Sequence, residues 1–239
     1  MRVSDKAIVL QAIKYGDKKQ ILKLFTKNHG LLTAAVVVGN SATSKIKAGI
    51  TFPLNLLDVE LIKKANKDIH RLNEANCYYI CTNITSSISK LTIAQFLNEV
   101  LIRCLKEQPP NIYLFDFIEG CIKYLNESDD HQVNLHVYFL FEFAKYLGIE
   151  PNNNYSTNNC FFDCREGRFI SMSLSFPLGL DKEDSFLFHE ALKINCLTKK
   201  LSNLQRQKLL SILLAYYQLH VPGFNQLKSL EVLKEVMMA

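Results

Sequence analysis

Two pairs of cysteines in this chain have a spacing suited to metal ligands. Cys77 and Cys81 are four residues apart, as are Cys160 and Cys164. A structural zinc ion takes four ligands, usually from two close pairs, so a site requires both pairs to meet, and nothing in the sequence brings them together. The chain has seven cysteines at irregular spacing, which favours reduced thiols over a disulfide framework. We therefore predict no bound metal and no cofactor.

The motifs of the common enzyme classes do not occur in the sequence. It has no glycine-rich phosphate loop and no Gly-x-Ser-x-Gly, and His189-Glu190 lacks the second histidine of His-Glu-x-x-His. Its acidic residues show no spacing for general acid–base work. Cys104 and Cys121 fall in apolar helical stripes, where cysteine is usually a small buried hydrophobic residue. We predict a protein with no catalytic site; an enzyme with a small-molecule site between two domains is a weaker alternative.

Positive charge is concentrated in the first third of the chain. Residues 1–79 contain 13 Lys or Arg against 6 Asp or Glu, whereas the remainder contains 15 against 17. This asymmetry indicates a polyanionic partner, because clustered lysines neutralise phosphates and displace counterions. Tyr15 and Phe25 lie among these lysines and are candidates to stack on bases, although Phe25 fits a core position better. A basic surface kept for solubility is the plain alternative. The candidate nucleic-acid-binding residues are Lys14, Lys18, Lys19, Lys23, Lys27, Lys45 and Lys47.

The first third has the pattern of short strands separated by turns. Three β-branched and apolar runs are divided by short glycine-containing turns, which predicts an antiparallel meander. The apolar alternation changes parity between Leu56 and Val59, which predicts a bulge near Leu57-Asp58 in a fourth strand. Five short strands with one longer connection predict a closed barrel of the OB type. The expected strands cover about residues 7–15, 20–26, 31–38, 52–61 and 69–79.

After about residue 86 the apolar period changes to that of amphipathic helices. Residues 135–147 are apolar nearly all round, which predicts a central buried helix capped by Gly148. The predicted fold is α+β: an OB-fold domain at 1–82 precedes an all-α domain at 83–239. That second domain carries an irregular β-hairpin insertion at about 149–185, without a complete zinc site. The expected helices cover about residues 93–105, 114–125, 135–147, 184–196, 202–219 and 227–237.

The cellular address follows from the absence of targeting signals. No apolar run approaches the ~18 residues needed to cross a bilayer. The opening residues are too charged, and their apolar run is too short, for a secretion signal. A cytoplasmic protein with no membrane partner is expected.

Three segments of the chain resemble RecO, a family of bacterial recombination mediators. The first, at 7–32, contains Tyr-Gly-Asp, Leu-Phe-Thr and His-Gly in that order. The second combines Leu-Gly-Ile-Glu-Pro-Asn at 147–152 with the stretch at 162–169, and the third covers 216–233. Each is moderately specific alone, but together they occur in order and span nearly the whole chain.

The resemblance implies a DNA-binding recombination mediator in DNA repair. Such a protein has an OB-fold before a helical domain, binds single- and double-stranded DNA and anneals complementary strands. It also helps to load RecA onto single-stranded DNA coated by single-strand-binding protein. The implied partners are RecR and the acidic C-terminal tail of the single-strand-binding protein. A scaffold whose barrel binds another protein and has little DNA affinity is the alternative.

The resemblance carries over to particular residues only where the motifs match. The family's DNA contacts are typically basic residues after the third strand, here 39–49, where only Lys45 and Lys47 are basic. Asn40, Ser41 and Ala42 stand where relatives usually have Arg or Lys, so the preceding lysines are expected to compensate. Lys228, in the motif Leu-Lys-Ser, is the best candidate to meet the acidic tail, by attraction between ammonium and carboxylate.

Overall fold

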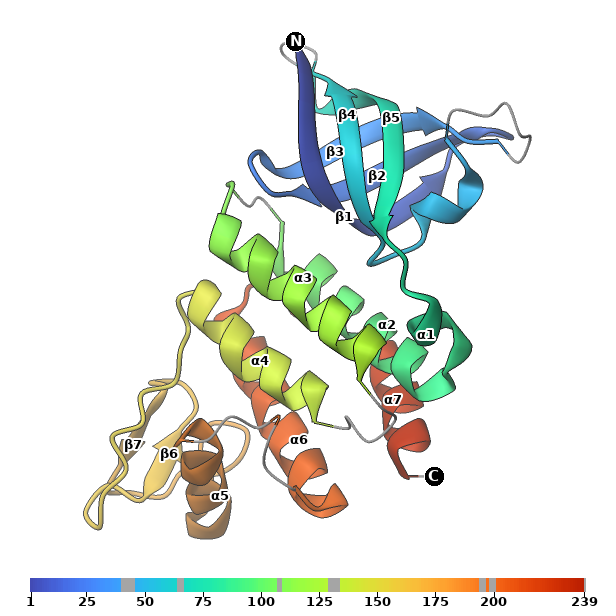
Figure 1. Cartoon of the computed structure of the whole chain (residues 1–239). Coiled ribbons are helices and arrows are strands. Elements are labelled where there is room, and N and C mark those ends of the chain that lie inside the picture. The colour runs from blue at the N-terminus through green and yellow to red at the C-terminus, as the bar shows by residue number, and fades with distance from the viewer. Residues whose placement is uncertain are drawn as a thin grey trace. The chain divides into compact units, whose positions relative to one another are not determined.

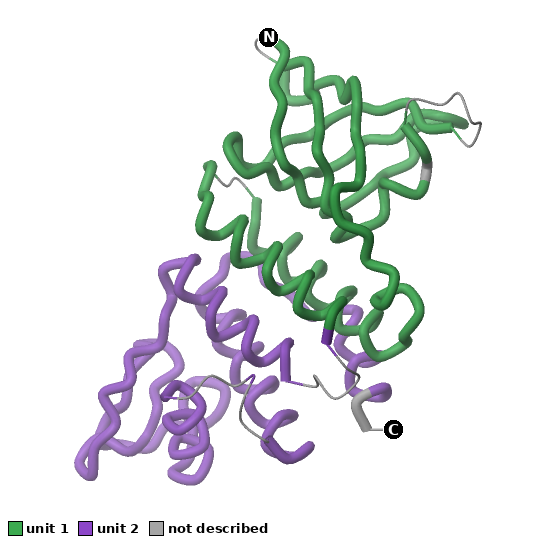
Figure 2. Tube along the Cα trace, viewed as in Figure 1, with its two compact units in different colours: residues 1–127 green, residues 128–239 purple. Residues whose placement is uncertain are grey.

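The computed structural model describes residues 1–39, 46–63, 67–106, 109–128, 134–193, 197 and 201–238. The chain divides into two compact units, residues 1–127 and 128–239, which Figure 2 shows in different colours. This division lies inside the helical part of the chain. The expected boundary at residues 82 and 83 therefore concerns a different division, between strands and helices, and it stays a prediction.

Unit 1 begins with a closed barrel of five strands in the order β1-β2-β3-β5-β4 (Figure 1). Neighbouring strands run antiparallel except β3 and β5, whose parallel pairing joins residues 33–35 to 69–71. The predicted OB-type barrel is therefore confirmed. The strands are β1 (Arg2–Lys14), β2 (Lys19–Thr26), β3 (Gly30–Val37), β4 (Leu56–Ile62) and β5 (Ile69–Tyr79).

Alternation along each strand decides which side chains fill the barrel. Leu22 and Leu24 of β2 lie in the same buried cluster as Ala34 and Val36 of β3. Because successive side chains of a strand point to opposite faces, the residues between them point outward. Each Val or Leu buried in this way contributes about 1.5–3 kcal/mol. The other members of the cluster are Ala7, Val9, Val38, Ile46, Leu57, Val59, Leu61, Leu72 and Ala75.

The fourth strand begins later than the sequence predicted. Residues Ala48–Thr51 form a short 3-10 helix, and a turn leads to Leu56, where β4 starts. Phe52 is 66% exposed, whereas Leu54 is buried with a positive φ of 64°. The period-two alternation that predicted a strand from residue 52 therefore arises in a turn. The β4–β5 register shifts between Leu56 and Leu57, which confirms a bulge near the predicted position.

Three helices complete unit 1, namely α1 (Thr82–Ser86), α2 (Ile88–Cys104) and α3 (Ile112–Glu127). Phe25, on the outer side of β2, is fully buried, and its ring centroid lies 6.1 Å from that of Phe115 in α3. The preference for Phe25 as a core residue is confirmed, although the core it joins lies outside the barrel. The helix α3 thus covers one end of the outer side of β2.

Unit 2 contains helices and the expected hairpin. The hairpin is β6 (Phe161–Asp163) paired with β7 (Arg168–Ile170). The first helix, α4, is largely buried as predicted, and Gly148 after it adopts a positive φ of 71°. Tyr217 of α6 donates a hydrogen bond of 2.7 Å to the Leu140 carbonyl of α4. The helices are α4 (Leu135–Tyr146), α5 (Lys182–Lys193), α6 (Asn203–His220) and α7 (Ser229–Met238). Within the described residues, no helix has both the length and the apolar character that a membrane span requires.

Candidate nucleic-acid interface

The outward residues of β1, β2, β3 and β5, together with Tyr15 directly after β1, form three rows across the barrel, which we call the outer face. The register that pairs Ile21 with Ile13 and with Ala35, and Ala35 with Arg71, sets the middle row. Neighbouring strands lie about 4.8 Å apart and rows two residues apart are separated by about 6.8 Å, so the face measures roughly 14 Å each way. The rows are Tyr15-Lys19-Val37, Ile13-Ile21-Ala35-Arg71 and Gln11-Lys23-Thr33-Ile69.

The outer face carries cations and no carboxylate among the residues that form its three rows. Lys19 and Arg71 are exposed and Lys23 is half-buried. Within the described part of the chain, none of the three forms an ion pair. Strand spacing puts Lys23 about 12 Å from Arg71 and about 14 Å from Lys19. Over about 14 Å of duplex axis, one DNA strand carries roughly four phosphates, since each adds 3.4 Å along that axis. This surface is suited to a polyanionic chain.

One end of the barrel adds further lysines next to the outer face. The Val38 amide donates to the Lys18 carbonyl at 2.8 Å, and the Gly39 amide donates to the Ile46 carbonyl at 3.0 Å. These bonds bring the β1–β2 turn and the segment at 46–47 to the two sides of the chain that leaves β3. Lys14, Lys18 and Lys47 are all exposed there. Lys45 lies outside the described residues, as do Asn40, Ser41 and Ala42.

Lys27 has a different environment from the other predicted lysines. Its ammonium donates a hydrogen bond of 2.7 Å to the Asp116 carboxylate of α3. That hydrogen bond is the main reason why the pKa of Lys27 is raised from its ordinary value. Lys27 therefore stabilises the contact between β2 and α3, and it is not brought together with Lys19 and Lys23.

A buried carboxylate fixes the β2–β3 turn at the other end of the barrel. Asp5 accepts hydrogen bonds from the Lys6 amide at 2.8 Å and from the Asn28 amide at 3.0 Å. It also accepts from the Asn28 side chain at 2.8 Å, and His29 Nδ1 lies 2.8 Å from its second oxygen. The Asp5 side chain is fully buried, so these contacts replace its hydration. The His-Gly motif thus serves the geometry of the turn.

The sequence interpretation missed part of the outer face. Arg71 is not among the candidates that the sequence indicates, and neither are the apolar residues Ile13, Val37 and Ile69. The parallel pairing of β3 with β5 brings Arg71 and Ile69 beside the β1–β2 lysines. Because that pairing joins residues far apart in sequence, no local pattern predicts it. The outward parity of residues 69 and 71 was the one available signal.

Charges on the opposite side of the barrel are compensated. Arg2 pairs with Glu60 at 3.2 Å between β1 and β4. The register places Lys6 opposite Asp58, and the Lys6 ammonium lies 4.5 Å from the centre of the Tyr78 ring. Arg2 and Lys6 therefore differ from Lys19, Lys23 and Arg71, which have no such acidic neighbour in their rows.

The described cysteines form no metal-binding group, and burial makes three of them poor nucleophiles. Cys164 is buried, and in the hairpin segment only Cys160 joins it as a thiol. No group of three or more His, Cys, Asp or Glu side chains with metal-binding geometry occurs among the described residues, a search that leaves out Cys196. Burial raises the pKa of Cys104 and Cys164 to about 12 and that of Cys81 to about 11. These thiols are therefore protonated at neutral pH, and thiolate is the nucleophilic and metal-binding form.

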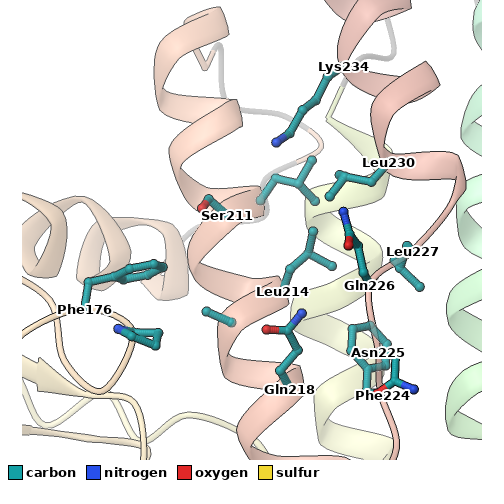
Figure 3. Close-up of a pocket in the computed structure, with 13 residues that line it drawn as sticks. Phe176, Ser211, Leu214, Gln218, Phe224, Asn225, Gln226, Leu227, Leu230 and Lys234 are labelled. Atoms are coloured by element: carbon teal, nitrogen blue, oxygen red, sulfur yellow. The ribbon is translucent and has the colours of Figure 1, made fainter.

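A groove in unit 2 lies beside the second predicted site. Its volume is about 290 Å³, just below the usual range of small-molecule pockets. Figure 3 shows Leu214 and Leu230 near each other, with the Lys234 side chain extending over one end of the groove, which Leu227 also lines. Lys228, which follows the groove residue Leu227, is exposed. The groove thus combines an apolar floor with ammonium groups nearby.

Two family models match the sequence of this chain. The family model described as Recombination protein O N terminal matches residues 1–80, and the one described as Recombination protein O C terminal matches residues 85–231. The first match covers the barrel, which carries the outer face, and the second covers most of the helices. Together they account for nearly the whole chain.

Curated relatives match over almost their full lengths. A DNA repair protein RecO of Phocaeicola vulgatus is 33% identical over 232 residues, which cover 96% of both chains. The protein of the same name from Flavobacterium psychrophilum is 34% identical over 240 residues, or 99% of both chains. That of Flavobacterium johnsoniae is 31% identical over 237 residues, again 99% of both.

Proposed function

Because the chain belongs to the RecO family of DNA repair proteins, we propose that it is a DNA-binding recombination mediator. In this proposal it binds single- and double-stranded DNA, anneals complementary strands and helps to load RecA onto DNA coated by single-strand-binding protein. Its activity is binding, without a bond-making step, and its place is the cytoplasm. The observation that supports this most directly is the set of cations on one side of the barrel without carboxylate partners among the described residues.

The proposed role of the outer face in annealing is electrostatic. Two complementary strands repel each other through their phosphates, and bound cations reduce that repulsion by displacing condensed counterions. Lys19, Lys23 and Arg71 contact one backbone across the face in this proposal. Lys14, Lys18 and Lys47 at the adjoining end extend the contact, and Lys45 is proposed with them.

The dependence of DNA affinity on salt tests the assigned surface. Replacing Lys18, Lys19, Lys23 and Arg71 together by Gln removes four proposed phosphate contacts. The log–log slope of affinity against salt should flatten by about 3.6 for duplex and by about 2.8 for single strands. Fluorescence anisotropy with labelled duplex and oligothymidylate, over a series of salt concentrations, measures both slopes.

A control variant separates a local effect from a change in net charge. Lys123, Lys145, Lys193 and Lys208 each lie 2.6–3.1 Å from a carboxylate oxygen, outside the barrel. Replacing these four by Gln removes the same charge, and the slope should change by less than about one unit, since no phosphate contact is lost. Equal flattening in the two variants would show that the outer face is not the DNA-binding surface.

For the acidic tail of the single-strand-binding protein, we propose Lys228 as a contact and the neighbouring groove as its apolar site. The groove residues Leu214 and Leu227 offer an apolar floor, and Lys228 and Lys234 offer cations. Exposed ion pairs contribute about 0.2–1 kcal/mol. Lys228→Gln should therefore weaken the binding of a labelled tail peptide by roughly 1.5- to 5-fold. Lys182→Gln, an exposed lysine at the start of α5, is the matched control. Equal affinity of the two variants would contradict the assignment.

RecR is the other proposed partner. Co-sedimentation with purified RecR, with and without nuclease, distinguishes direct association from bridging by DNA. The scaffold would be supported in place of the DNA-binding mediator by two results together. RecR would still associate after nuclease treatment, and the DNA affinity of the protein would be weak and independent of salt.

A further inference from the structure

We propose that Tyr15 makes the outer face selective for unpaired bases, by stacking, while the cations around it bind single and double strands alike. This inference rests on the proposed function and assigns a specificity-determining residue within that surface. It is based on the exposed apolar side chains of the outer face, which have no role in binding phosphates.

The outer face exposes more apolar surface than a phosphate-binding sheet requires. Tyr15 is 68% exposed, Val37 61%, Ile13 52% and Ile69 44%. Large apolar side chains are common singly on protein surfaces, but here four of them occur on one face of about 14 Å. They lie in the same three rows as Lys19, Lys23 and Arg71. Cations without carboxylates favour a polyanion, and the apolar surface between them favours a polyanion that also offers flat apolar groups.

Unpaired bases provide those flat apolar groups, and a duplex does not. In B-form DNA the base faces are stacked on one another, and only base edges are accessible in the grooves. In single strands the faces are available, and stacking on an aromatic side chain contributes about 1–3 kcal/mol per base. Among the exposed apolar residues of the outer face, Tyr15 is the aromatic one.

The position of Tyr15 suits this role. Its amide donates a hydrogen bond of 2.8 Å to the Lys19 carbonyl, which fixes the residue at the end of the β1–β2 pair. Tyr15 and Val37 line a shallow depression of about 600 Å³ together with residues of the turn, which bring two ammonium groups, from Lys18 and Lys19, and one carboxylate, from Asp17. Because Lys18 and Lys19 line the same depression, they are the cations we assign to the phosphates of a base stacked on Tyr15. Gly16 after it has a positive φ of 88°, a turn conformation that glycine adopts without strain, and the Tyr15 side chain is exposed.

The test compares single and double strands of equal length for the full chain. Tyr15→Ala should weaken binding of an oligothymidylate of about 16 nucleotides by between about 5-fold and 150-fold. Binding of a duplex of the same length should change by less than about 2-fold, because stacking is absent there. Tyr15→Phe keeps the ring and should retain the affinity of the parent protein for the single strand.

The salt dependence of affinity and a second tyrosine variant distinguish the possible outcomes. Since stacking releases no counterions, Tyr15→Ala should shift the log–log line for the single strand without changing its slope. Tyr113→Ala removes a tyrosine that is 80% exposed on α3 and belongs to none of the three rows of the outer face, and it should change neither affinity. An equal loss for both DNA forms, or no loss for either, would overturn the inference. In the second case the apolar surface would be assigned to a protein partner. Failure of the charge variants to change the salt slope would instead overturn the proposed function.

Discussion

Replacing Asp5 by Asn should destabilise the barrel strongly while preserving its shape. The two side chains have the same outline, but one acceptor oxygen becomes an amino group that can only donate. If the amino group takes the position of Oδ2, it meets the Asn28 amide and His29, which are 3.0 and 2.8 Å away. In the other orientation it meets the Lys6 backbone amide and the Asn28 side-chain Nδ2, both at 2.8 Å. Either way at least one buried donor loses its acceptor.

The magnitude follows from the number of donors affected. A change of the His29 tautomer restores one contact in the first orientation, which leaves one backbone donor unsatisfied at about 1–3 kcal/mol. Loss of charge from the remaining hydrogen bonds adds about 1 kcal/mol. The expected total is about 2–4 kcal/mol, which lowers the Tm by roughly 8–16 °C at about 4 °C per kcal/mol.

Thermal melting followed by circular dichroism, together with urea unfolding, measures this effect. Asp68→Asn removes the same charge at an exposed position and should stay within about 0.5 kcal/mol of the parent protein. A second control is DNA binding, whose salt slope Asp5→Asn should leave unchanged below the melting temperature. If Asp5→Asn melts within about 2 °C of the Asp68→Asn control, the reasoning that Asp5 fixes the turn is refuted. The substitution would then have lowered the free energy of unfolding by only about 0.5 kcal/mol or less.

Three further predictions concern other described residues. Gly167→Ala should destabilise unit 2 by at least about 1–2 kcal/mol in urea unfolding, because Gly167 has a φ of 63° and an added Cβ would lie 2.6 Å from the Tyr216 hydroxyl. Burial lowers the pKa of His136 to about 3, below its unfolded value of 6.5, so the stability it provides is complete above pH 6.5 and is lost as the pH falls towards 3. Between pH 7 and pH 5, the protein should therefore lose about 2 kcal/mol more than its His136→Leu variant. Lys27→Gln should leave the salt slope of duplex binding unchanged, because Lys27 is engaged by Asp116, whereas Lys19→Gln should flatten it by about 0.9.

The features of the fold that depend on local pattern were predictable. The meander of β1 to β3 follows from apolar runs divided by short turns, and the buried α4 follows from a segment that is apolar all round. The start of β4 was predicted wrongly because Phe52 and Leu54 alternate in polarity within a turn. The difference lies in the positive φ of Leu54, which lets its side chain reach the core from a turn, and residue type does not indicate it.

The candidate site was predictable in charge but not in arrangement. A count of lysines located it on the barrel, and Lys19 and Lys23 were both among the candidates. The inclusion of Arg71 depends on the parallel contact of β3 with β5, in which residues 33–35 meet residues 69–71. Contacts of that sequence separation leave no periodic signal. The same holds for Asp5 and His29, whose contact joins a strand to a turn 24 residues later.

The helix α3 determines which outward residues of β2 are available to a ligand. Lys19, Lys23, Phe25 and Lys27 all point away from the barrel interior and differ little in their local sequence setting. Phe25 is buried against Phe115, and Lys27 is paired with Asp116, so two neighbouring residues of α3 cover this end of the strand. Towards the other end no described residue pairs with Lys19 or Lys23. A helix some ninety residues later in the chain therefore sets the limit of the outer face, and charge density along β2 alone would overestimate the binding surface.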